Sequence, residues 1–492
     1  MKVERWWIAA VLIVLGLTAC QTELELTDRT FRCQTSADCA DGYRCVPVPG
    51  EQRTRVCKQP GEGFPSRDAG DEADTDTSGP AGDADANIEH DTSDVETDPD
   101  VRPHADNELV VTSGQDFSCA FTAAGEAYCW GRNQEGQLGT GGSPEDNAWT
   151  PVPVQMPGTT FISTPATVDS KHRLTCAIGV DRAVYCWGRN NGGSANPATL
   201  DPVVLPTRVE FPDDSLRFAQ VVVGYDHACA LSRDSELYCW GSNLRGQQGV
   251  GRSGEGEMGK PPERVDESGF EHEVEHFIEV AAGLEFTCAS TNADRVYCWG
   301  LDDFGRLANG ESDQDADTPR KIESGDWTGE PVVDLTAYAE TACMLVHDGD
   351  AYCWGRNADG QVGAGSTEET SHVEPSLVVG DFSFEGLYSG ELHTCAITDA
   401  GRAVCWGAND NSQLGLEGAE GDSVLQPGEP IRPTAFNEEL PFRHLAPGVA
   451  HTCGVTDERD PRVFCWGDNT VGQLGNDSVS EDTAVPHLVE LP

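Results

Sequence analysis

The sequence predicts an all-β fold, a seven-bladed β-propeller of repeats about 55 residues long, and three observations lead to it. A Cys…Cys-Trp-Gly unit occurs seven times from residue 108 onward, at intervals of 52 to 60 residues. Glycine (54) and proline (29) are abundant, which suits many short strands and turns. Strand segments such as 296–299 are apolar on both faces, so each sheet should be covered on both sides. Radially packed blades provide such cover and leave few exposed edges.

The first segment, residues 1–20, is predicted to be an export signal. A positively charged start precedes the apolar run Trp6–Leu15, which is too short for a comfortable transmembrane helix. The sequence Leu17–Cys20 resembles the lipobox of bacterial lipoproteins. This resemblance implies that Cys20 is lipidated and that Gln21 directs sorting to the outer membrane. We therefore expect an exported chain, anchored at the outer membrane or cell surface of a bacterium. An ordinary cleaved signal is the alternative.

Residues 21–60 are predicted to form a small module held together by disulfides. Forty residues bury little core, so covalent cross-links have to supply much of the stability. The cysteine spacings contain no Cys-x2-Cys pair, and no histidine lies nearby, which disfavours the rival zinc site. Three connectivities stay open for two disulfides. The four cysteines of this module are Cys33, Cys39, Cys45 and Cys57.

Residues 61–107 are predicted to be a disordered acidic linker. The segment holds 15 acidic residues against two arginines and few large apolar residues, so burial cannot offset its chain entropy. Residues 83–87 resemble the opening of a calcium loop, but Ile88 occupies the position of the turn glycine and Asp94 that of the bidentate glutamate. The whole chain has a formal net charge of −52, which disfavours nucleic acid and anionic lipid as partners. Membrane contact is expected only through the N-terminal lipid.

The propeller itself is predicted to span residues 108–492, and its cysteine spacing predicts the hairpins. If Cys119 faces Cys129 across an antiparallel hairpin, a three-residue loop, 123–125, remains with glycine third. The seventh unit has two extra residues, which keeps the strand parity. Opposed cysteines on neighbouring strands can form a bridge, so we predict one disulfide per repeat. The predicted pairs are Cys119–Cys129, Cys176–Cys186, Cys229–Cys239, Cys288–Cys298, Cys343–Cys353, Cys395–Cys405 and Cys453–Cys465.

Two further strands accompany each hairpin. One precedes it and ends near glycine, as in Phe218–Gly224, and a proline-led strand such as Pro151–Val154 follows it. The first copy begins at 108–114 without a proline-led strand ahead of it, whereas the last copy ends with 485–491. The expectation is that this C-terminal strand completes the first blade, so that both chain ends close the ring.

The repeat resembles the regulator-of-chromosome-condensation repeat family. The matching motifs are Gly-x-x-His-Thr-Cys-Ala at 390–396, Val-Tyr-Cys-Trp-Gly at 296–300 and Gly-x-Asn-x-x-Gly-Gln-Leu-Gly at 131–139 and 467–475. The resemblance implies a seven-bladed propeller. It also implies a choice among functions, because the family includes exchange factors for a Ran-type GTPase, chromatin-associated proteins and a bacterial inhibitor of β-lactamases. WD repeats are shorter, about 40–45 residues.

Catalytic chemistry is not predicted. His227, His393 and His451 share a slot that holds Phe117 or Leu174 in other repeats, so the slot is a packing position. The seven tryptophans that follow the cysteines are likewise predicted to pack between blades. The sequence has no nucleophile elbow, zinc-protease motif or P-loop, so we expect no catalytic residue, no cofactor and no metal ligand.

The predicted function is therefore that of a non-catalytic propeller that binds a protein partner, with basic partners favoured by charge. Trp149 and Trp327 fall outside the repeat register and are candidates for a binding surface. The propeller is expected to be monomeric and not to bind nucleic acid. The alternatives are a glycan-binding propeller and a hydrolase with paired carboxylates in the central channel, which would need opposed pKa shifts. Guanine-nucleotide exchange, implied by the resemblance alone, would require cytosolic exposure.

Overall fold

The computed structural model describes residues 44–47, 55–58 and 108–492, the last range without 143–145, 157, 271–274, 323–326, 328, 417–420, 422, 429–430, 432–440 and 479–481. The predicted signal segment with Cys20, the cysteines Cys33 and Cys39, and the predicted linker lie outside these residues. Strands β1 (Arg44–Pro47) and β2 (Arg55–Lys58) pair antiparallel, with Cys45 opposite Cys57 in the backbone register.

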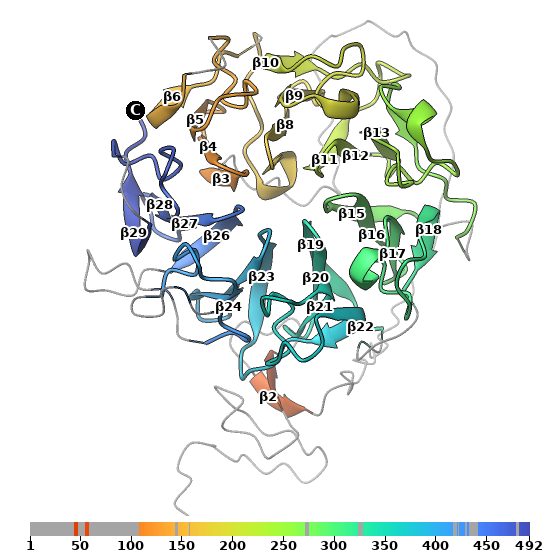
Figure 1. Cartoon of the computed structure of the whole chain (residues 1–492), viewed down its shortest axis with the longest axis vertical. Coiled ribbons are helices and arrows are strands. Elements are labelled where there is room, and N and C mark those ends of the chain that lie inside the picture. The colour runs from red at the N-terminus through yellow and green to blue at the C-terminus, as the bar shows by residue number, and fades with distance from the viewer. Residues whose placement is uncertain are drawn as a thin grey trace, which may run out of the picture.

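Seven antiparallel sheets form a ring, as predicted (Figure 1). The first blade consists of β3 (Val110–Ser113), β4 (Phe117–Phe121), β5 (Ala127–Gly131) and β6 (Ala148–Pro153). The second consists of β7 (Val168–Lys171), β8 (Leu174–Ile178), β9 (Val184–Gly188) and β10 (Val203–Arg208). The third consists of β11 (Phe218–Val223), β12 (His227–Ser232), β13 (Leu237–Gly241) and β14 (Glu263–Arg264).

The fourth and fifth blades are β15 (Phe277–Ala282), β16 (Phe286–Thr291), β17 (Val296–Gly300) and β18 (Ala316–Lys321); and β19 (Val332–Tyr338), β20 (Thr341–Val346), β21 (Ala351–Arg356) and β22 (Ser371–Leu377). The last two blades are β23 (Phe384–Ser389), β24 (His393–Thr398) and β25 (Ala403–Gly407); and β26 (Phe442–Pro447), β27 (His451–Thr456), β28 (Val463–Gly467) and β29 (Thr483–Val489). The described helices are short 3-10 turns, η2 (Pro165–Thr167), η3 (Asn191–Gly193), η4 (Glu255–Glu257) and η5 (Asp303–Gly305).

The hairpins have the predicted register. Cys119 pairs with Cys129, and Thr122 N donates to Glu126 O at 2.9 Å across the three-residue loop. Gly125 closes this loop with a φ of 77°, the left-handed conformation that glycine adopts without steric cost. All seven predicted propeller disulfides are formed, one in each blade. The cysteines are buried because every sheet is covered by its neighbours on both faces.

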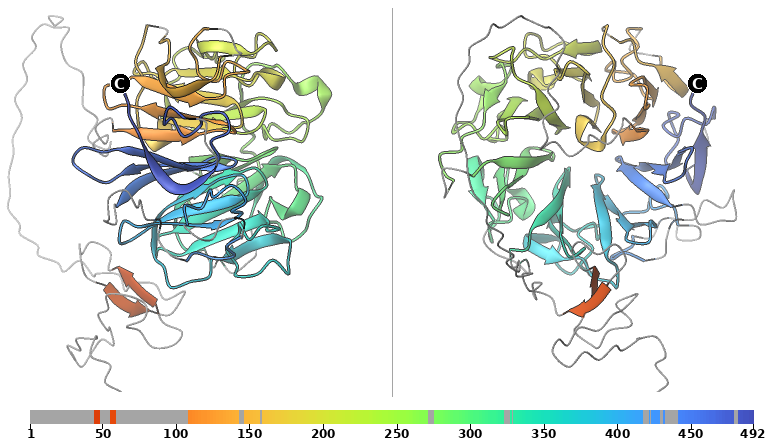
Figure 2. Two further views of the ribbon diagram at one scale, coloured as in Figure 1. Left: turned by 60° about the vertical axis from the view of Figure 1, so that its left-hand side comes forward. Right: turned by 180° about the vertical axis from the view of Figure 1, so that it is seen from behind.

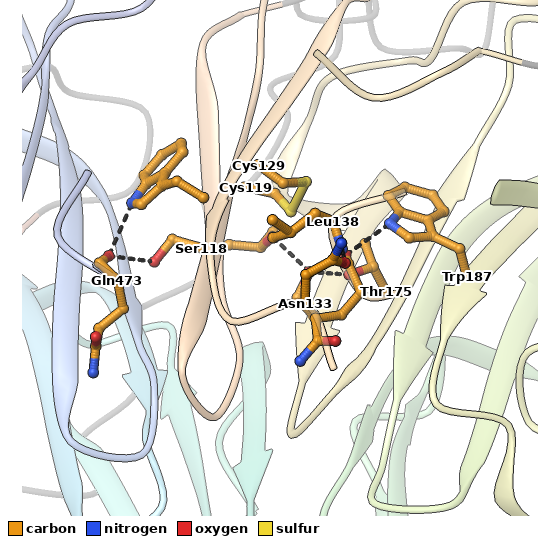
Figure 3. The surroundings of a disulfide bond; sticks show 12 residues. Ser118, Cys119, Cys129, Asn133, Leu138, Thr175, Trp187 and Gln473 are labelled. Atoms are coloured by element: carbon orange, nitrogen blue, oxygen red, sulfur yellow. Dashed lines mark hydrogen bonds between the residues drawn. A yellow bond between two sulfur atoms is a disulfide. The ribbon is translucent and has the colours of Figure 1, made fainter. Parts of the chain in front are cut away.

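The tryptophans pack between blades, as predicted. Each indole Nε1–H donates to a backbone carbonyl of the preceding blade, as Trp187 does to Gln137 O at 3.0 Å. The series runs around the whole ring and includes Trp130, whose Nε1–H donates to Gln473 O of the seventh blade at 2.8 Å. Figure 3 shows Gln473 and Trp187 on either side of the Cys119–Cys129 disulfide of the first blade. All seven indoles are fully buried.

The prediction for the C-terminal strand is wrong. Strand β29 pairs with β28 and completes the seventh blade, whereas the first blade has its own outer strand, β6. In six of the seven blades an outer strand follows the hairpin in sequence and pairs with it, and the sixth blade has three strands among the described residues. The ring still closes between the first and last blades, which lie side by side in both views of Figure 2. The closure depends on side chains: His451 Nε2 bonds Ser118 Oγ at 2.8 Å, and His444 Nε2 donates to Val111 O at 2.9 Å.

Candidate functional site

The main concave site is a cavity of about 310 Å³ in the central channel. The innermost strands of the seven blades line it, namely β3, β7, β11, β15, β19, β23 and β26, which converge on the centre in Figure 1. Its polar lining includes three carboxylates, Asp169, Glu279 and Asp334, and one ammonium group, that of Lys171. The sequence analysis singled out none of these four residues.

Several channel side chains bond the backbone of the next inner strand and so join neighbouring blades. Asp169 Oδ2 accepts from Val223 N at 2.8 Å. The Gln220 amide donates to Val280 O at 2.9 Å and accepts from Val280 N at 3.0 Å. These bonds satisfy edge groups that a strand at the rim of a sheet would otherwise leave unpaired. Much of the polar lining therefore stabilises the ring.

Glu279 and Asp334 form a carboxylate pair on the adjacent inner strands β15 and β19. Burial raises the pKa of Glu279 well above its usual range, and the nearby Asp334 carboxylate raises it further. Burial also raises the pKa of Asp334 to about 6. A hydrolytic pair needs one carboxyl group that stays protonated and one that stays ionised. Because both pKa values move upward, this pair does not meet the condition set for the hydrolase alternative.

The three repeat-slot histidines are buried packing residues. Nε2 of His227 lies 3.0 Å from Thr287 Oγ1, and Nε2 of His393 lies 2.8 Å from Thr452 Oγ1, in each case across a blade interface. Each threonine hydroxyl donates to a backbone carbonyl, so each histidine donates its Nε2–H to the threonine. Burial lowers the pKa of both imidazoles to about 3. Neutral, sequestered imidazoles of this kind hold blades together.

The two out-of-register tryptophans lie in different parts of the ring. Trp149, in β6, is 36% exposed and rests against Gly472 of the seventh blade. Trp327 precedes β19, is half-buried against the core of the fourth and fifth blades, and donates its Nε1–H to Glu330 O at 3.1 Å. The two indoles thus do not form one surface, and a binding role for either stays a prediction.

A ring of carboxylates lies on the face formed by the turns between the first and second strands of the blades. We call the acid ring the set Asp116, Asp226, Glu285, Glu340 and Glu391, which come from five of these turns. Its members repel one another across blades. Burial is the main cause that raises the pKa of Asp226 to about 6, and the Glu285 carboxylate of the next blade also raises it. Burial, followed by Glu340, raises the pKa of Glu391.

Arginines compensate the acid ring only in part. Arg132 Nε lies 2.8 Å from Asp116, Arg189 Nε lies 3.3 Å from Asp226, and Arg306 Nη2 lies 3.2 Å from Glu340. Within the described part of the chain, Glu285 and Glu391 have no such ion pair. Arg356 Nε also lies 3.7 Å from Glu340, and its charge acts on Glu391, so this face presents two carboxylates that have no ion pair of their own among the described residues.

Two further properties concern ligands and membranes. Among the described residues, no three His, Cys, Asp or Glu side chains are grouped so that they could hold one metal ion. In the same residues, no helix has the length and apolar character that crossing a membrane requires.

Comparison with known families accounts for the whole propeller. Residues 168–492 match the RCC1-like domain, and residues 124–167 and 110–137 match the regulator of chromosome condensation (RCC1) repeat.

Curated relatives and solved structures are similar to parts of the chain. The ultraviolet-B receptor UVR8 of Arabidopsis thaliana is 29% identical over 315 residues, which cover 64% of this chain and 67% of the receptor. The human E3 ubiquitin-protein ligase HERC2 is 27% identical over 384 residues, 77% of this chain but only 7% of the ligase.

Among solved structures, human WBSCR16 aligns with a TM-score of 0.64 and 21% identity, covering 75% of this chain and 94% of that one. Prp20p of Saccharomyces cerevisiae, described with its binding properties to Gsp1p and histones, aligns with a TM-score of 0.60 and 19% identity, covering 71% and 82%. At these identities the structures show a shared fold.

Proposed function

The chain belongs to the RCC1-like repeat family, and from this premise we propose that it is a non-catalytic, protein-binding propeller that works outside the cytosol. The acid ring is the observation that carries the proposal. It places two carboxylates without an ion pair among the described residues, Glu285 and Glu391, on a face made of turns, where side chains can vary without disturbing the blades. Many polar groups of the core, in contrast, are engaged in joining blades.

The proposed partner is a protein with a basic surface. A formal net charge of −52 attracts cationic proteins and speeds their association, and the acid ring supplies a local focus for this attraction. Prp20p, a structural neighbour, is described as binding histones, which supports a basic partner by analogy. Nucleic acid is excluded from the proposal because its phosphates would be repelled.

Export is proposed from the chemistry of the cysteines. Seven buried disulfides persist only in an oxidising compartment, which is where the predicted signal segment would deliver the chain. We propose further that Cys20 carries a lipid that holds the protein at a bacterial envelope. Labelling of wild-type chain but not of Cys20→Ala with a fatty-acid analogue in cells is the expected result. Equal labelling of the two would contradict the anchor.

Affinity capture tests the binding function. The full-length protein is immobilised and exposed to envelope and culture fluid of the source organism, with washes at high salt because an acidic protein collects basic proteins nonspecifically. One stoichiometric partner should survive the washes. The variant Glu285→Gln/Glu391→Gln, which removes the two unpaired carboxylates of the acid ring, should retain less of it.

A matched control separates a specific face from overall charge. The variant Asp234→Asn/Asp460→Asn removes two charges from exposed residues in hairpin loops between the second and third strands, at the opposite ends of the strands from the acid ring. It should capture the partner as the wild type does. Equal loss in both variants would show that net charge alone accounts for the capture. If the wild type retains no stoichiometric protein, the proposed function is refuted.

A further inference from the structure

The wall of the central cavity carries more carboxylates than ammonium groups, and the excess lies at Glu279 and Asp334. The Lys171 ammonium lies 3.2 Å from the Asp169 carboxylate and also donates to Ala282 O at 3.0 Å, so these two charged groups satisfy each other. Glu279 and Asp334 remain. No basic side chain of the described residues forms an ion pair with either carboxylate, although both lie at the wall of the same cavity.

Each carboxylate of this pair has capacity for another donor. Asp334 Oδ2 accepts from Leu387 N at 3.0 Å, and Leu335 N is a backbone donor to Glu279 and also to Asp334. An ionised carboxyl group has about four lone-pair sites, so each group can still accept further hydrogen bonds. Burial is the main reason why both groups hold protons more tightly than usual, and the Asp334 carboxylate adds to this effect on Glu279.

A second and independent observation concerns buried polar atoms in the cavity wall that have no hydrogen-bond partner. They are His444 Nδ1, Ser389 Oγ and Ser113 Oγ, on residues that are 9%, 6% and 3% exposed. His444 donates its Nε2–H to Val111 O, so Nδ1 carries a free lone pair. Burial lowers the pKa of this imidazole to about 4, which keeps Nδ1 an acceptor at neutral pH. An unpaired buried polar atom is costly, and a ligand that pairs it recovers that cost.

The remaining wall combines aliphatic side chains with the rings of Tyr338 and Tyr388 and several hydroxyl groups. Val222, Val280, Leu335 and Leu387 line the cavity between the polar groups. A ligand that fits this wall therefore combines several hydrogen-bond donors, positive charge and a short apolar stem. A metal ion does not fit as well, because no three ligating side chains are grouped there among the described residues.

We propose that the central cavity binds a small aliphatic diamine, with one ammonium group between the Glu279 and Asp334 carboxylates and the alkyl stem against the aliphatic wall. The cavity volume of about 310 Å³ suits a ligand of this size. The site is separate from the acid ring and from protein binding. The bound cation would reinforce the contact between the fourth and fifth blades, which the hydrogen bond from Leu335 N to Glu279 already joins.

Calorimetric titration of the full-length protein with 1,4-diaminobutane tests the proposal, at an ionic strength of about 0.15 M so that exposed charges are screened. We expect saturable binding of one diamine per chain. The neutral analogue 1,4-butanediol should not bind. The variant Glu279→Gln/Asp334→Asn should bind at least about tenfold more weakly, because the charge-assisted hydrogen bonds are lost. The exposed-charge control Asp234→Asn/Asp460→Asn should bind as the wild type does.

Proton exchange provides a readout that needs no variant. A cation between the two carboxyl groups favours their ionised forms, so binding near pH 6 should release protons. Titration in two buffers with different ionisation enthalpies measures this release. Binding without proton release, equal weakening in both double variants, or no saturable binding to the wild type would each overturn the proposal. Tighter binding of Nα-acetyl-lysine amide than of the diamine would also overturn it, since the ammonium group would then come from a partner's lysine.

Discussion

Removing one hairpin disulfide should destabilise the propeller by an amount that follows from the loop it closes. The Cys288–Cys298 bridge has a sequence separation of 10. Cross-linking a loop of that length lowers the entropy of the unfolded chain and so raises the free energy of unfolding by about 3 kcal/mol at 25 °C. Both cysteines are fully buried, so Cys288→Ala/Cys298→Ala also leaves a small void, at about 1 kcal/mol. The expected loss in the free energy of unfolding is therefore about 4 kcal/mol.

Urea unfolding without reductant, followed by tryptophan fluorescence, measures this loss. The midpoint should fall and the slope should rise, because an unfolded chain without the cross-link exposes more surface. Ser290→Ala is the matched control. It shortens a buried side chain in the same hairpin whose hydroxyl has no partner, so it should cost almost nothing. A disulfide variant that unfolds at the same urea concentration as this control would refute the entropic argument.

Three further outcomes follow from the interfaces between blades. Replacing His393 by Phe should reduce the loss of stability as the pH falls below 6.5. The pKa of the native imidazole is lowered to about 3, so in acid the unfolded chain takes up a proton at this residue and the folded protein does not. Urea midpoints at neutral and acidic pH measure this difference. Glu279→Gln/Asp334→Asn should raise the urea midpoint at pH 7 but not near pH 4. Folding raises the pKa of both carboxyl groups, so the folded state holds their protons more tightly and loses stability as the pH rises to about 6 and above. Trp299→Phe should cost about 1–3 kcal/mol in urea unfolding, because Gln247 O loses the indole N–H donor at 3.0 Å and the smaller ring packs less well.

The hairpins were predictable because their geometry is local. Nine residues between Cys119 and Cys129 leave one arrangement in which the cysteines oppose each other across a tight turn, and that arrangement forms. The packing role of His393 was predictable for a related reason: a position that accepts phenylalanine in other repeats has to be apolar. Seven copies of one pattern supply such internal comparisons without any second sequence.

The channel site was not predicted, because no local pattern marks it. Glu279 and Asp334 lie on inner strands that are 55 residues apart in sequence, and only the packing of one blade against the next makes them neighbours. The repeat itself contains a weak indication of this polar layer. Gln220 and His444 occupy the equivalent position in other inner strands, so a polar residue recurs there within otherwise apolar segments. Aligning the inner strands would have identified this polar layer, though not the empty volume beside it.

The corrected position of β29 changes how ring closure is understood. A strand shared between the first and last blades would make their interface stronger than the other six. In this chain the interface instead repeats the contacts found elsewhere: the Trp130 indole donates to Gln473 O as Trp187 does to Gln137 O, and His451 bonds Ser118 as His393 bonds Thr452. The same residues that stack one blade on the next therefore also close the ring, and closure needs no special strand. Because the chain does not connect the first blade directly to the seventh, this interface is the place where the ring can open without stretching a connecting loop. Within each blade the disulfide ties the second strand to the third, so an opened ring would still consist of intact blades.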